Sequence, residues 1–126
     1  MRMRVILPTL LLATALPVLP AYADGDAHWV SVAGSDAAPG TEADPWRTLQ
    51  HAVDQADPGA QINVLPGTYA GMRIERSGAP GAWITLRAVG AAIIDTPGPN
   101  NRHDSNVELE TWEGTGTVSY WVLEGF

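Results

Sequence analysis

The stretch DPWRTLQHAVDQADPGAQINVLPGTY, residues 44–69, contains the pattern of one helix followed by one strand. Asp44 followed by Pro45 is a helix-start signal, an N-cap carboxylate before a proline in the first turn. Asp57-Pro58-Gly59 ends the segment. Between them the apolar residues recur with helical spacing, which predicts an amphipathic helix with one buried stripe: Trp46, Leu49, Val53 and Ala56.

Short runs of β-forming residues, separated by Gly- and Pro-rich turns, make up most of the chain after this helix. The offsets from Ile62 to Ile84, from Ile74 to Ile94 and from Ile84 to Val107 are 22, 20 and 23 residues. This recurrence predicts an all-β solenoid whose coils stack on one another, with the single α-helix as its N-terminal cap. A β-sandwich is the alternative, but the chain lacks the tight Asn-Gly or Asp-Gly hairpin turns typical of antiparallel strands. The predicted strands are 28–32, 61–65, 72–76, 83–88, 91–95, 106–110 and 120–123.

The first residues have the layout of a signal peptide. Arg2 and Arg4 precede an apolar run, and Ala21-Tyr22-Ala23 is a small-x-small cleavage pattern. The apolar run is interrupted by prolines and is shorter than the ~20 residues that span a bilayer. We therefore expect residues 1–23 to be removed between Ala23 and Asp24, the protein to be secreted or periplasmic, and the mature chain to be free of the membrane.

The charge of the chain limits its partners. The sequence holds fourteen acidic residues and seven arginines, with no lysine and no cysteine, so its formal net charge is −7. Loss of Arg2 and Arg4 with the signal peptide makes this −9. A strongly acidic chain argues against nucleic acid as a partner, because phosphate backbones are bound through basic patches. Without cysteine, neither a disulfide nor a thiolate metal site can form.

The chain closes on SYWVLEGF, residues 119–126, which has the pattern of a strand with one apolar face. A solenoid coil is stable only when a neighbouring coil covers it, and about three repeats are usually needed. We therefore expect residues 24–126 to be an incomplete domain, the cap and first coils of a longer array.

Residues 29–69 resemble the N-terminus of secreted right-handed parallel β-helix proteins of the pectate-lyase-like superfamily. The motifs that carry the resemblance are Gly34-Ser35-Asp36, Pro39-Gly40-Thr41, Pro45-Trp46-Arg47-Thr48, Pro58-Gly59 and Pro66-Gly67-Thr68-Tyr69. The continuation, RIERSGAPGAWITLRAVGAAIID, is similar to the first coils of polysaccharide lyases of families 9 and 6. Two features depart from the family pattern: Trp83 stands where such proteins often carry proline, and 97–116 is a long polar insertion.

The resemblance implies a right-handed parallel β-helix in a polysaccharide lyase that acts on an anionic, uronate-containing glycan. The family's catalytic base and metal-binding acids lie on later coils, so the catalytic residues are expected beyond Phe126, and Ca²⁺ is expected only in the full-length protein. A non-catalytic surface or carbohydrate-binding β-helix protein is an alternative, because the same opening introduces proteins of many activities. A truncated product without activity is another.

Candidate substrate-binding residues follow from strand alternation. Burial of Ile74, Ile84 and Leu86 predicts that Arg73 and Arg87 point outwards, where they could line a groove for an acidic polymer. Among the tryptophans, Trp46 and Trp121 are expected in the core, whereas Trp112 is the best candidate for an exposed sugar-stacking ring. A solvated surface is the alternative for all three candidates, Arg73, Arg87 and Trp112.

The polar loop 100–104 combines a base, a cation and a carboxylate. Asp95, Asp104 and Glu108 are conceivable oxygen ligands, but their spacing matches no compact calcium loop, so the sequence predicts no metal site. His28 and His51 lack local triad or metal partners, and His51 is expected to face solvent. An ordinary surface loop is the expected role of 100–104.

Overall fold

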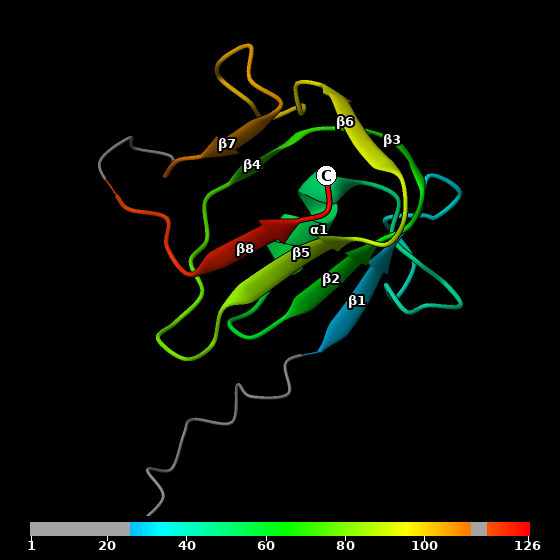
Figure 1. The fold of residues 1–126 in the computed structure, drawn as a ribbon, viewed down its shortest axis with the longest axis horizontal. Helices are drawn as coiled ribbons and strands as arrows, with labels where there is room; N and C mark the ends of the chain where they lie inside the picture. The colour runs from blue at the N-terminus through cyan, green and yellow to red at the C-terminus, as the bar shows by residue number, and fades with distance from the viewer. Residues whose placement is uncertain (1–25, 112–115) are drawn as a thin grey trace, which may run out of the picture.

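The computed structural model describes residues 26–111 and 116–126. It contains one short helix and eight strands in these two ranges (Figure 1). No helix among the described residues is long and apolar enough to cross a membrane. The elements are β1 (Ala27–Val30), α1 (Leu49–Gln55), β2 (Gln61–Val64), β3 (Gly67–Ala70), β4 (Met72–Ile74), β5 (Ile84–Ala88), β6 (Ala92–Thr96), β7 (Val107–Leu109) and β8 (Trp121–Glu124).

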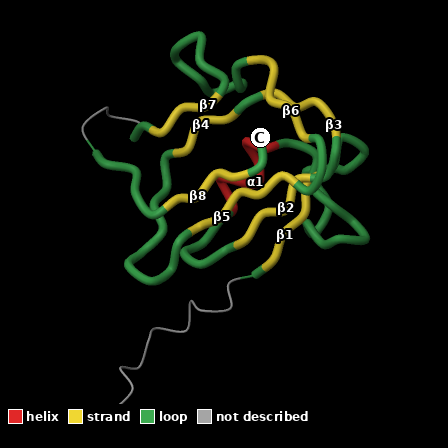
Figure 2. The backbone as a smooth tube through the Cα atoms, viewed as in Figure 1, coloured by secondary structure: helices red, strands yellow, loops and turns green. Residues whose placement is uncertain are grey.

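The strands form three parallel sheets, ordered β1-β2-β5-β8, β3-β6 and β4-β7. Figure 2 shows the first sheet on one side of the molecule and the two smaller sheets on the other. The chain visits the three sheets in the same order twice, first through β2, β3 and β4 and then through β5, β6 and β7. Every pairing between these named strands is parallel, which differs from the antiparallel pairing of a β-sandwich.

The register of the sheets corrects the repeat spacing expected from the sequence. Ile62 lies beside Leu86, an offset of 24, but Leu86 lies beside Leu123, an offset of 37. None of the three offsets taken from the sequence matches a strand pairing, because Ile62 pairs with Leu86, Ile74 with Leu109 and Ile84 with Trp121. Chain inserted between β6 and β7, and between β7 and β8, lengthens the second circuit and removes the regular period.

The core lies between the three sheets, where equivalent inward positions of successive strands stack. Ile62, Leu86, Met72 and Ile74 are fully buried, and α1 packs mainly against β4. The inward positions on β7 and β8, the last strands of their sheets, are less buried. Leu109, the register partner of Ile74, is 48% exposed, and Leu123, the register partner of Leu86, is 37% exposed.

The helix begins later than the sequence predicts. Asp44 is not its N-cap; Thr48 is, with an extended backbone and a side-chain oxygen that accepts the amide of His51 at 3.2 Å. Trp46 is not helical, because its backbone pairs with the end of β1. The Trp46 amide donates to the Trp29 carbonyl, and the Trp46 carbonyl accepts from the Ser31 amide. The predicted apolar stripe is nevertheless confirmed, since Trp46, Leu49, Val53 and Ala56 are all buried.

Asp36 connects the loop after β1 to the start of the helix. Its Oδ1 accepts the backbone amides of Arg47 and Thr48, each at 2.9 Å, and its Oδ2 accepts the Thr48 hydroxyl at 2.7 Å. Burial raises the pKa of the Asp36 carboxyl, but these hydrogen bonds from Thr48 and Arg47, with the nearby His51, hold it below its ordinary value. Asp36 is therefore ionised in the folded protein.

Replacing Asp36 by asparagine is expected to lower the free energy of unfolding by about 1–2 kcal/mol at neutral pH, because charge-assisted hydrogen bonds are lost. The pKa of Asp36 is lower in the folded state, so its contribution is present above the ordinary value of 3.8 and is lost as the pH falls through the folded value. Urea unfolding from neutral to acidic pH should therefore show the variant and the parent converging in acid. Glu42→Gln, an exposed acid in the same loop, is the control; a gap that stays constant with pH would contradict the assignment.

Candidate functional site

Arg87 lies on β5 and points outwards, with its side chain 49% exposed. Its Nε is ion-paired with a carboxylate oxygen of Glu124, its register partner on β8. The predicted outward orientation is therefore confirmed. An anionic ligand at this sheet would have to compete with Glu124 for the Arg87 charge, and the substrate-binding role of Arg87 stays a prediction.

Arg73 does not point into solvent, and this expectation was wrong: its side chain is only 1% exposed. The physical reason is that the segment after β7 covers the outer face of β4. The Arg73 guanidinium donates to the Thr111 carbonyl at 3.1 Å and lies 3.1 Å from Glu75 Oε1. On the other side, the Gln50 side chain of α1 bonds to both backbone groups of Arg73, at 2.9 and 3.0 Å. Arg73 thus fixes β4 between α1 and the covering segment.

The tryptophans divide as expected where they are described. Trp46 and Trp121 are buried, and their indole nitrogens donate to the carbonyls of Ala38 and Arg76 at 2.9 and 2.7 Å. Trp112, like Ala23 and Asp24 at the expected cleavage point, lies outside the described residues. His51 is half-buried rather than solvent-facing, with its ring edge-on to Trp46 at 5.1 Å.

Trp83 is an exposed aromatic residue that the sequence pattern marks only as a departure from the family. Its side chain is 51% exposed, and it meets Tyr120 edge to face, with ring centroids 5.5 Å apart. Tyr120 also has a positive φ of 62°. A half-exposed tryptophan beside a tyrosine offers a flat apolar surface of the kind that stacks against a sugar ring.

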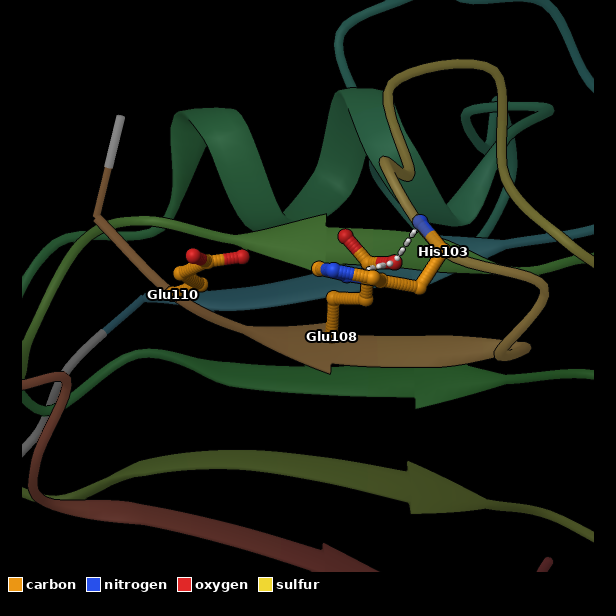
Figure 3. Close-up of side chains that lie close together, drawn as sticks. All are labelled: His103, Glu108 and Glu110. Carbon is orange, nitrogen blue, oxygen red and sulfur yellow. Dashed lines mark hydrogen bonds and ion pairs between the residues drawn. The ribbon is translucent and has the colours of Figure 1, made fainter. Parts of the chain in front are cut away.

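A cluster of possible metal ligands lies where β7 meets the preceding loop (Figure 3). His103, Glu108 and Glu110 each offer one ligand atom, and these atoms lie within 4.8 Å of one another. It is the one such group of three or more in the described ranges 26–111 and 116–126. Of the three oxygen ligands conceivable from the sequence, only Glu108 belongs to it; Asp95 and Asp104 do not.

Glu108 is the buried member of this cluster, only 6% exposed. Its Oε1 accepts the amide of His103 at 2.6 Å and the Ser105 hydroxyl at 3.1 Å, and its Oε2 accepts the amide of Arg102 at 2.9 Å. Burial raises the pKa of the Glu108 carboxyl, but these hydrogen bonds and the neighbouring His103 outweigh burial, so the pKa lies below its ordinary value. An ionised Glu108 therefore holds the loop 102–105 against β7.

A cleft of about 420 Å³ lies beside the loop that carries His103, and Pro99, Asn100 and Arg102 of that loop line it. Its walls carry charges of both signs, from Arg73 and Glu75 on the β4 side and Arg102 on the loop side. A second cleft, of about 490 Å³, lies between the start of α1 and β3. The charged cleft can accept a polar ligand, and it lies at the segment 100–104, for which the sequence predicts an ordinary surface loop.

The known proteins that this chain resembles are much longer than the segments that match it. Residues 32–77 match the model of a family described as "Protein of unknown function (DUF1565)". The chain is 41% identical over 64 residues to "Uncharacterized protein YwoF" of Bacillus subtilis (strain 168), a match that covers 50% of this chain and 14% of that protein. A solved structure, "The complex structure of XylC with xylose", aligns with a TM-score of 0.50 at 30% identity, over 52% of this chain and 10% of XylC.

These similarities and the structure agree on one class: a mostly β protein with parallel strands and one short helix, similar in structure to a protein solved in complex with xylose. The chain spans about a seventh of the curated relative and a tenth of the structural relative.

Proposed function

We propose that this chain is the cap and first coils of a right-handed parallel β-helix in a secreted carbohydrate-active protein. The observation that carries the proposal is the repeated order of the sheets, in which β5, β6 and β7 lie on β2, β3 and β4. The crossover connection between two parallel strands of one sheet is right-handed in nearly all proteins, which predicts a right-handed coil here. Leu109 and Leu123, exposed above buried register partners, are the positions that a further coil would cover.

The substrate proposed is an acidic polysaccharide, cleaved by β-elimination. Support comes from the family resemblance, from the sugar complex of the structural relative and from Arg87 on the broad sheet. A uronate lyase removes the proton beside a carboxylate, which needs a base and a cation that stabilises the developing charge. On this proposal the base and any Ca²⁺ ligands lie on coils outside this chain, and Arg87 contributes to binding the polymer.

The test is a lyase assay of the intact secreted gene product on pectate, alginate and chondroitin, with and without Ca²⁺. We expect ultraviolet absorbance from unsaturated ends on at least one of these polymers. Arg87→Ala should raise KM by about 3- to 10-fold with kcat little changed, because one charge-assisted contact is lost. Arg76→Ala is the matched control, because Arg76, which follows β4, has a similar exposure and is likewise ion-paired, with Asp57. No absorbance rise on any polymer would contradict lyase activity.

A non-catalytic carbohydrate-binding protein is the second candidate, and the exposed Trp83 beside Tyr120 favours it. On this account the chain is retarded by glycans in affinity electrophoresis without forming products. Trp83→Ala should then abolish the retardation, whereas Trp83→Phe should keep part of it because an aromatic face remains. Formation of unsaturated or new reducing ends would rule this candidate out.

A further inference from the structure

We propose that His103, Glu108 and Glu110 form a binding site for a divalent transition-metal cation, with Zn²⁺ as the best-fitting ion. The site is independent of the proposed carbohydrate function, and it would fasten the loop before β7 to the strand itself. The inference rests on the position, burial and charge of these three side chains.

The backbone places the two carboxylates together. Glu108 lies in β7 and Glu110 follows the strand two positions later, with the amide of Glu110 still bonded to the Ile74 carbonyl at 3.0 Å. Side chains two residues apart on extended backbone point to the same face. The loop before β7 then turns back so that the His103 ring lies beside both (Figure 3).

The spacing needs only a small adjustment to hold an ion. Ligand atoms at ~2.0–2.2 Å from one Zn²⁺ lie about 3–4 Å from each other. The three ligand atoms lie within 4.8 Å of one another, and His103 Nδ1 is 3.3 Å from Glu108 Oε1. Because His103 is exposed and Glu110 half-buried, rotation of these two side chains can close the remaining distance while Glu108 stays fixed.

The charges also suit a divalent cation. Two carboxylates and one neutral imidazole balance a charge of 2+. Glu108 is oriented by three donors, two on Oε1 and one on Oε2, which leaves one lone-pair position, on Oε2, for the ion. Arg73 is the cation opposite Glu108 in the register of β4 and β7. Its guanidinium lies 3.1 Å from Glu75, whose charge offsets it.

The ligand set distinguishes between metals. Ca²⁺ takes six to eight oxygen ligands, so an imidazole and two carboxylates suit it poorly. Zn²⁺ accepts nitrogen and carboxylate oxygen in one site, and three protein ligands leave a fourth position for water. Zn²⁺ should therefore bind in preference to Ca²⁺ at this position.

A simple ion pair between His103 and Glu108 is the competing explanation. The role of Glu110 distinguishes this explanation from a metal site. An ion pair accounts for the 3.3 Å contact but gives Glu110 no part. A metal site requires all three residues. Glu110 is also the safer residue to change, because Glu108 holds the loop through its own hydrogen bonds.

The experiment is calorimetric titration of the full, metal-free chain with Zn²⁺, with thermal unfolding measured in parallel. We expect one ion per chain and a raised melting temperature, with Ca²⁺ at the same concentration giving neither. Glu110→Gln and His103→Asn should each weaken Zn²⁺ binding by at least about tenfold, as loss of metal-site groups generally does.

Asp104→Asn is the matched control, since Asp104 is an exposed acid next to His103 but outside the cluster. It should leave Zn²⁺ affinity unchanged. The proposal is overturned if Zn²⁺ does not bind, or if it binds the Glu110→Gln and His103→Asn variants as tightly as the parent, which would place the ion outside this cluster.

Discussion

Replacing Leu86 by alanine is expected to lower the free energy of unfolding by about 2–5 kcal/mol, the range for large-to-small changes in a packed core. Leu86 lies in β5 with no exposed surface, beside Ile62 of β2 and Leu123 of β8. The shortened side chain would leave a cavity between two stacked strands. Because small domains are stable by only about 5–15 kcal/mol, the variant should unfold at a much lower urea concentration.

Leu123→Ala is the matched comparison, because Leu123 occupies the equivalent inward position one strand further along the sheet. Its side chain is 37% exposed, so truncation removes fewer buried contacts. The loss should be less than about half that of Leu86→Ala, since the penalty scales with buried surface and cavity volume. Equal losses in urea unfolding followed by circular dichroism would contradict the stacking described for this sheet.

Gly71→Ala is expected to destabilise the fold by about 3 kcal/mol or more, because overpacking against rigid backbone cannot relax. A Cβ at Gly71 would lie 1.7 Å from the carbonyl oxygen of Asn106. Neither segment can move away easily. The Gly71 amide donates to the Thr96 carbonyl at 2.8 Å, and the next amide, of Met72, donates to Asn106 at 3.0 Å. The clash therefore lies where the inserted loop ends and β7 begins to pair with β4.

Gly81→Ala provides the control for this prediction. Gly81 has a positive φ of 74°, but no neighbouring atom lies within 4 Å of the position that an alanine methyl group would take, so only the backbone preference opposes alanine. That preference is worth about 1–2 kcal/mol. Hydrogen exchange should show lost protection of β7 amides in Gly71→Ala and not in Gly81→Ala. Retained protection in both would show that the loop does not pack on Gly71 as described.

The apolar pattern around α1 was predictable from sequence, but its backbone was not. The buried stripe from Trp46 to Ala56 follows from spacing alone. The helix starts later because the Trp46 backbone bonds to Trp29 and Ser31, at the end of β1. No local helix-start signal encodes this contact. The carboxylate of Asp36, eleven residues before Arg47 in the chain, stabilises this helix start by accepting the Arg47 amide.

The orientation of outward-facing residues was only partly predictable, for a related reason. Alternation gives the correct face for both Arg73 and Arg87. Whether an outward residue meets solvent depends on the segment after β7, whose course the pattern does not encode. That segment contacts the Arg73 guanidinium through the Thr111 carbonyl and buries it, whereas Arg87 is half-exposed.

The candidate metal cluster had one detectable signal in the sequence. Glu108 and Glu110 are two positions apart in a predicted strand, so two carboxylates on one face could have been expected. His103 could not have been placed beside them, because its position depends on the hydrogen bonds that fold its loop onto Glu108.

The central claim, that successive circuits of the chain stack strand on strand, is tested most directly by paired cysteines in this otherwise cysteine-free protein. Gln61 of β2 and Thr85 of β5 are register partners, so the double variant Gln61→Cys, Thr85→Cys places two Cα atoms about 5 Å apart, within disulfide range. Gln61→Cys with Arg87→Cys shifts one partner by two residues, to about 8 Å, beyond that range. The account predicts rapid oxidative cross-linking of the first pair and little of the second; no preference between them, or a preference for the second, would contradict it.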